Sequence, residues 1–243
     1  SPLDMPAACD GCGAKMMVEH ALSCKVGGLV HIRHDDVADE WRHLCGTALS
    51  PSRVEREPPI FRCVSHRARV AAGNTTPPPP STPTATPPTP PTTTEERGDA
   101  SCHGFWKRGR TCIFDMRITD TDAKSYRKKD FGKVLLQHEK EKKDKYLRTC
   151  LELRKDFTPM VYSVDGIAGR EARNAEKRLA THLASKWNRG YSQMVYYVRV
   201  RMAIAVVRAN SLLIRGSRDR QQPRRPLIPD GAALGDWRTW QDN

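Results

Sequence analysis

The chain has 243 residues and carries 41 lysines and arginines against 28 aspartates and glutamates, a formal net charge of +13. Such an excess of positive charge usually meets a polyanion, either nucleic acid or an anionic membrane surface. The sequence has no charge-free apolar run of about eighteen residues and no signal-peptide pattern at its start. These features argue against a membrane-spanning or secreted protein, and we expect an intracellular protein without a membrane partner. Because the chain begins with Ser1, we also expect it to be a piece of a longer product.

Three cysteines and one histidine lie close together near the start of the chain. In a reducing compartment, clustered cysteines are better explained by a metal than by disulfides. Three thiolates and an imidazole are ligands that tetrahedral zinc prefers, and they are supplied here by Cys9, Cys12, His20 and Cys24. With four protein ligands no position is left for a substrate, so the pattern predicts a structural Zn²⁺ in a knuckle at 1–30. The alternative is a reduced, cysteine-rich turn.

Hydrophobic periodicity predicts the remaining elements in chain order. A helix is expected at about 35–49 and a short edge strand at 54–64. Nine of the eighteen prolines fall within 75–94, so a disordered insertion is expected at about 66–97. The later elements are a strand at 111–120, a long charged helix at 130–156, a strand at 157–166, helices at about 170–188 and 192–214, and a basic disordered tail at 218–243.

This order of strands and helices predicts an α/β fold, in which helices flank a central mixed sheet within a core at 31–217. Such a layout brings the ends of the early strands together, and those ends carry Glu57, Asp99 and Asp115. Convergent carboxylates can hold Mg²⁺, which activates water and stabilises the leaving oxygen of a phosphodiester. The pattern therefore predicts a metal-dependent nuclease. The alternative is that all three are surface acids of a charged protein.

Several segments resemble the region that follows the reverse transcriptase in retroelement polyproteins. Besides the Cys-Cys-His-Cys element, they are RHDDVADE, EPPI, GFWKRG, IFDMRITDTDAKSY, HEKEKKDKY, FTPMVYSVDGIAG and RANSLLIRGS, and together they cover about Cys9 to Ser217. Non-LTR elements with a restriction-like endonuclease show a similar order of polymerase, zinc knuckle and nuclease. The resemblance implies a restriction-endonuclease-like core that cuts target DNA during integration in the nucleus, with DNA and element RNA as partners and a reverse transcriptase in the same polyprotein.

The restriction-like pattern implied by this resemblance has an acid on one strand, an aspartate at the next and Asp/Glu-x-Lys on the third. Here Asp115 is followed by Met116 and Arg117, so an arginine replaces the lysine. Arginine stays protonated and can stabilise a developing phosphorane charge, but it cannot accept a proton from water. In some restriction-like nucleases the lysine lies on the following helix, and Lys133 or Lys140 would take that place. No Tyr/Phe-x-Asp-Asp polymerase motif occurs, so the chain is expected to be the tail of such a product or a decayed copy.

The last predicted helix carries a regular series of basic residues. Arg201, Arg208 and Arg215 recur every seven residues, which places them on one helix face. They are predicted to bind nucleic-acid phosphates, or alternatively to form the solvent side of the helix and pair with acids. Two further readings of the whole chain remain: a non-catalytic zinc-containing nucleic-acid-binding module of a retroelement protein, and a protein-interaction adaptor.

Overall fold

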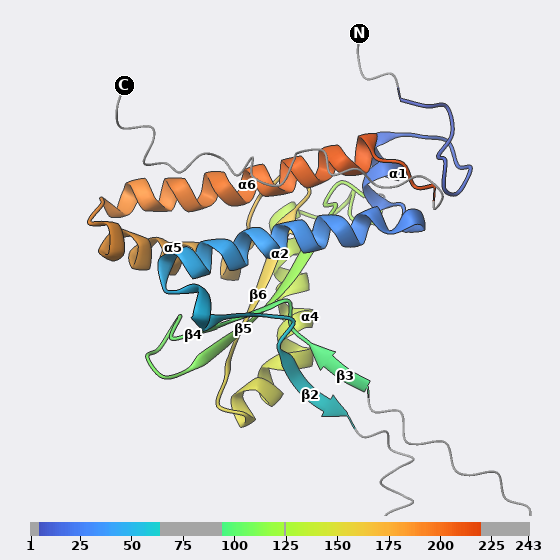
Figure 1. Ribbon diagram of the computed structural model, residues 1–243. Coiled ribbons are helices and arrows are strands. Elements are labelled where there is room, and N and C mark those ends of the chain that lie inside the picture. Colours follow the sequence, from blue (N-terminus) through green and yellow to red (C-terminus); the bar gives the residue numbers. More distant parts are fainter. Residues whose placement is uncertain (1–4, 64–93, 124, 220–243) are drawn as a thin grey trace, which may run out of the picture.

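The computed structural model describes residues 5–63, 94–123 and 125–219 (Figure 1). A four-stranded mixed sheet in the order β1-β4-β5-β6 lies at its centre. Strands β1, β4 and β5 pair antiparallel, whereas β6 runs parallel to β5 from the Cys112–Asp156 pair to the Thr119–Ser163 pair. The strands are β1 (Val54–Arg56), β4 (Ala100–His103), β5 (Thr111–Thr119) and β6 (Asp156–Ser163). The α/β class with a helix-flanked mixed sheet is therefore confirmed.

Helices cover both faces of this sheet. One face carries α2 (Leu29–Ala48), α5 (Arg170–Trp187) and α6 (Tyr191–Arg215), with α2 and α6 side by side (Figure 1). The other face carries α4 (Phe131–Glu152), which forms the crossover from β5 to the parallel strand β6. The backbone N–H of Lys133 donates to the Asp130 side chain at 3.1 Å, which caps the start of α4. No helix in the described ranges combines the length and apolarity needed to span a bilayer.

Strand β5 shows how the two faces differ. Phe114 and Met116 belong to the large core shared with α2, α5 and α6, whereas Ile113 packs with Tyr146 of α4 in a smaller core. Because side chains alternate along a strand, Asp115 lies on the same face as Ile113, toward α4. The order of residues in β5 therefore decides which helix can reach each side chain.

A two-stranded ribbon lies beside α4. Its strands are β2 (Pro59–Cys63) and β3 (Thr94–Arg97), which pair antiparallel. Lys145 of α4 forms an ion pair with Glu96 at 2.7 Å, and Lys155 donates to the carbonyl of Pro59 at 3.2 Å. Ile60 completes the smaller core under α4, so the ribbon is held to this helix by packing as well as by charge.

Three of the predicted boundaries need correction, and one strand was not predicted. The helix expected from 35 begins at Leu29, because Gly28 adopts the left-handed conformation that lets the chain enter the helix there. The single strand expected at 54–64 is two strands in different sheets, because Glu57 (φ +48°) and Pro58 interrupt it. Residues 94–97 form β3 and are not part of an insertion, and β4 was not predicted. The rest of that insertion, from 66 to 93, lies outside the described residues.

Candidate metal centres

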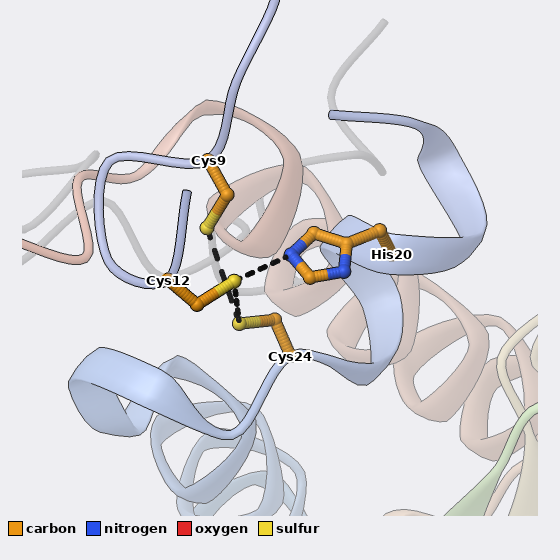
Figure 2. A group of neighbouring side chains, drawn as sticks. All are labelled: Cys9, Cys12, His20 and Cys24. Atoms are coloured by element: carbon orange, nitrogen blue, oxygen red, sulfur yellow. Dashed lines mark hydrogen bonds between the residues drawn. The ribbon is translucent and has the colours of Figure 1, made fainter. Parts of the chain in front are cut away.

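The predicted zinc ligands come together at the N-terminal end of the molecule. Figure 2 shows Cys9, Cys12, His20 and Cys24 pointing toward one another, and their ligand atoms all lie within 4.8 Å of one another. Cys9 and Cys12 come from a turn in which Gly13 is left-handed (φ +73°). His20 and Cys24 come from the short helix α1 (Val18–Ser23) and its C-cap.

The distances within this cluster suit a tetrahedral metal. The Sγ atoms of Cys9 and Cys24 are 4.0 Å apart, those of Cys12 and Cys24 are 3.9 Å apart, and Cys12 Sγ is 3.3 Å from His20 Nε2. A zinc ion about 2.3 Å from each sulfur would separate two sulfurs by about 3.8 Å, whereas a disulfide needs about 2.05 Å. The cluster can therefore hold a structural metal such as zinc, and it is compatible with a zinc knuckle.

The two buried thiols differ in acidity. Burial by itself raises the pKa of Cys9, but hydrogen bonds with the Cys12 backbone and the His20 side chain outweigh it and bring the pKa to about 6. Burial raises the pKa of Cys24. Metal binding requires the thiolate form, so the turn around Cys12 favours the ligand state at Cys9 even without an ion.

The knuckle is held to the end of α6 by Arg218, whose side chain is only 1 % exposed. Its Nη2 atom donates to the carbonyls of Ala21 and Leu213 at 2.8 and 2.5 Å, and its backbone N–H donates to Asp10 at 2.8 Å. A Cβ on Gly27 would lie 2.7 Å from Arg218 Cα, so only glycine allows this approach. A disordered tail from 218 is therefore wrong for Arg218 and the following residue, while 220–243 lies outside the described residues.

We expect Arg218→Ala to lower the free energy of unfolding of the knuckle by about 3 kcal/mol, because two hydrogen bonds from a charged donor are lost and two buried carbonyls lose a partner. Amide hydrogen exchange of Ala21 and Leu213, measured over a series of urea concentrations, gives this change in free energy. Arg215→Ala, three residues earlier and exposed, is the matched control and should change stability by no more than about 0.5 kcal/mol. Equal effects of the two substitutions would contradict the role of Arg218.

The second candidate centre is a pair of aspartates between the sheet, α2 and α4. Asp99 directly precedes β4 and Asp115 lies in the middle of β5, and their carboxyl groups are within hydrogen-bonding reach of each other. The Asp99 carboxylate also accepts from the backbone N–H of Met116, which fixes it against β5. Both side chains are largely buried, at 19 % and 9 % exposure.

The two carboxyl groups titrate differently. Burial raises the pKa of Asp115 to about 6, and the charge of Asp99 adds to this while Lys142 opposes it. Burial also acts on Asp99, but hydrogen bonds from His34 and from Met116 N–H lower its pKa. His34 Nε2 lies 3.2 Å from Asp99, and this hydrogen bond raises the pKa of His34 to about 9. At neutral pH the pair therefore carries negative charge, which His34 and Lys142 offset through their contacts with the two carboxylates.

A lysine from α4 completes this pair. Lys142 Nζ is 2.6 Å from Asp115 Oδ2. Lys140, the predicted lysine, is exposed, and so is Lys133. Residues two apart on a helix point about 200° from each other, so Lys140 cannot face the sheet when Lys142 does. The sequence carried a signal for this choice, because Lys142 stands seven residues after the buried Leu135 and four before the buried Tyr146.

The other predicted catalytic residues lie near the pair without joining it. Glu57 is bonded through its backbone N–H to the Asp99 carbonyl at 3.3 Å, but its side chain is 56 % exposed and pairs with Arg56. Arg117 forms an ion pair with Glu141 of α4 at 2.9 Å. Among the described residues no group of three ligand atoms converges at Glu57, Asp99 and Asp115. His34 was not predicted as a site residue; only its place in the RHDDVADE segment pointed to it.

The arginines predicted to bind phosphates are in different surroundings. Arg201 is 11 % exposed, pairs with Glu40 at 2.8 Å and donates to the Tyr197 hydroxyl at 3.0 Å. Arg208 and Arg215 are both exposed. Burial raises the pKa of Asp36, and the positive charge of the nearby Arg208 opposes this shift. The first arginine thus ties α6 to α2, and two of the three predicted arginines remain accessible.

Comparison of the chain with models of known protein families finds no match, and comparison with curated proteins finds none either.

Proposed function

We propose that this chain is a metal-dependent DNA endonuclease module carrying a structural zinc. The observation that carries the proposal is the buried Asp99–Asp115 pair with Lys142 Nζ 2.6 Å from Asp115. Two acids and a lysine beside a central strand are the groups that the restriction-like pattern uses, with the lysine moved to the following helix. The placement of Asp99 before β4 and Asp115 on β5 supports a restriction-endonuclease-like core.

The donor set of the pair fits Mg²⁺. This ion usually takes one or two carboxylates and keeps water or substrate phosphate at its other positions, so Asp99 and Asp115 are sufficient without Glu57. Two carboxyl groups at this distance repel each other when both are ionised, and the raised pKa of Asp115 reflects burial together with this repulsion. When bound here, Mg²⁺ supplies a Lewis acid for a phosphodiester and lowers the pKa of a bound water.

The residues of the chain then have distinct tasks. The hydrogen bond from Met116 N–H and that with His34 hold the Asp99 carboxylate in one orientation. Lys142 holds the Asp115 carboxylate and brings a positive charge to the place where negative charge grows in phosphodiester cleavage. Arg117 lies two residues after Asp115, on the same face of β5, and forms an ion pair with Glu141 of α4. DNA is the proposed substrate, and the net charge of +13 supports a polyanion.

We also propose that the module derives from a retroelement polyprotein and acts in the nucleus, with element RNA as a second partner. The sequence resemblance supports this origin, and the Cys/His cluster at the expected place relative to the sheet domain is in keeping with it. The purified protein should nick supercoiled plasmid DNA when Mg²⁺ is added. Tight plasmid binding without any nicking would favour the non-catalytic nucleic-acid-binding module.

We expect Lys142→Ala to lower the rate of Mg²⁺-dependent nicking about 100-fold, the usual loss when one preorganised donor is removed from an active site. Lys140→Ala is the matched control, because Lys140 lies on the same helix, carries the same charge and is exposed. It should leave the rate within about twofold. Single-turnover nicking at saturating protein separates this effect from weaker DNA binding, and equal rates of the two variants would contradict the assignment of Lys142.

A further inference from the structure

A basic pocket lies at the end of the sheet opposite the aspartate pair. Its volume is about 590 Å³, and it is lined by Leu49, Arg53, His103, Gly104, Arg108, Gly109, Arg178 and His182. These residues come from the end of α2, the 3₁₀ turn η2 (Pro51–Arg53), the β4–β5 turn and α5. Three arginines and two histidines line it and no acid does, a composition typical of an anion site.

Hydrogen bonds to the β4–β5 turn hold part of this pocket in place. Arg178 donates from Nε to the carbonyl of Phe105 at 2.9 Å and from Nη2 to that of Trp106 at 3.1 Å. His182 Nε2 is 2.9 Å from the same Phe105 carbonyl. Burial and the nearby Arg178 lower the pKa of His182, although the hydrogen bond with Phe105 opposes them. Arg178 and His182 are thus oriented before any ligand arrives.

Two further arginines, Arg53 and Arg108, line the pocket. Arg53 and Arg108 are exposed, and neither forms an ion pair with an acid in the part of the chain that the structure describes. A Cβ on Gly104 would lie 3.6 Å from Arg53 Nη1, so this guanidinium lies against the turn that also carries Arg108. Gly104 and Gly109 are both left-handed (φ +81°), which keeps the turn narrow and its backbone open to a ligand.

We propose that this basic pocket binds a phosphate of a nucleic-acid strand, at a site separate from the aspartate pair. Asp99 precedes β4 and His103 ends it, and four residues of strand separate the two by about 13 Å. Pockets of roughly 300–1,000 Å³ hold small ligands, so a phosphate fits together with its sugar. The choice of nucleic acid as the source of the phosphate rests on the proposed function; free nucleotides share the same chemistry.

The test compares two charge-matched double variants in an Asp115→Asn background, so that DNA stays intact. One is Arg53→Gln with Arg108→Gln. The control is Arg148→Gln with Arg154→Gln, two exposed arginines of which the first lies near the C-terminal end of α4 and the second lies two residues after that end. Binding of a labelled 20-base-pair duplex is measured by fluorescence anisotropy across a salt series. The pocket variant should lower the slope of log K against log salt by about one unit, the value for one lost phosphate contact, and the control should leave it unchanged.

Free ligands provide the second arm. Inorganic phosphate and dAMP are titrated against the same protein while the imidazole signals of His103 and His182 are followed by NMR. Movement of these signals with the duplex and with dAMP supports the proposal. Movement with inorganic phosphate or dAMP but not with the duplex, or equal salt slopes for the two double variants, overturns it. The outcome is independent of the proposed nuclease activity, which fails only if the wild-type chain does not nick DNA with Mg²⁺.

Discussion

Asp115→Asn should abolish Mg²⁺-dependent cleavage, with a loss of about 1,000-fold or more, while DNA affinity stays the same or rises slightly. A metal that stabilises the transition state contributes several kcal/mol, and each 1.36 kcal/mol corresponds to a factor of ten in rate. Asp115 is one of the two carboxylates of the buried pair, so its removal takes half of the proposed Mg²⁺ ligands. Affinity should not fall, because the substitution removes negative charge that would face the DNA phosphates in the proposed complex.

The measurement is plasmid nicking over a Mg²⁺ series, with anisotropy for binding. Asp144→Asn is the matched control, because Asp144 is an exposed acid of α4 two residues after Lys142. It should nick at the wild-type rate. If Asp115→Asn nicks as fast as Asp144→Asn, the aspartate pair is not the active site.

Loss of the zinc ligands should have the second large effect. Cys12→Ser should reduce zinc from one ion per chain to none and unfold the knuckle, because apparent binding energies of structural zinc sites are on the order of 10–16 kcal/mol and are also folding energy. Since Arg218 ties the knuckle to the end of α6, the last turn of α6 should loosen as well, while the sheet and α4 remain folded.

Zinc content by atomic emission and amide exchange of α6 measure these two effects. Cys150→Ala is the control: Cys150 is buried in the smaller core under α4, away from the cluster, and its loss should cost some stability without changing the zinc content. A Cys12→Ser protein that keeps one zinc ion, or loses it with α6 unchanged, would contradict the site or its coupling to the helix, respectively.

Local pattern was sufficient for several parts of this protein. The Cys/His cluster was predictable because its four ligands lie within sixteen residues, and a turn and one short helix are enough to bring them together. The cores of α4, α5 and α6 and the strands β5 and β6 followed from periodicity, because the apolar faces of these elements repeat within each segment. Strands as short as β3 and β4 hold too few residues for such a repeat, and both were missed.

The aspartate site shows where local pattern ends. The sequence predicted that Asp99 and Asp115 belong to one site, but it grouped them with Glu57 and chose Lys140. Glu57 itself adopts the left-handed backbone conformation before Pro58, and its side chain lies in solvent. Only the packing of α4 on the sheet decides that Lys142 and not Lys140 faces Asp115. A step of 100° per residue makes such a choice depend on the rotation of the whole helix.

By itself the sequence determined the zinc-type ligand set, the α/β class and the basic character of the chain, since each depends on composition or on neighbours along the chain. The tertiary structure alone decided three partnerships: His34 with Asp99, Arg201 with Glu40, and Arg218 with the carbonyls of Ala21 and Leu213. The pairs His34–Asp99, Arg201–Glu40 and Arg218–Ala21 each join residues that are 65 or more positions apart, whereas Leu213 precedes Arg218 by only five. A charged side chain can pair only with a group that the fold brings within about 3 Å of it. For a buried charge this pairing is needed for stability, because an unpaired charge in the interior raises the free energy of the folded state.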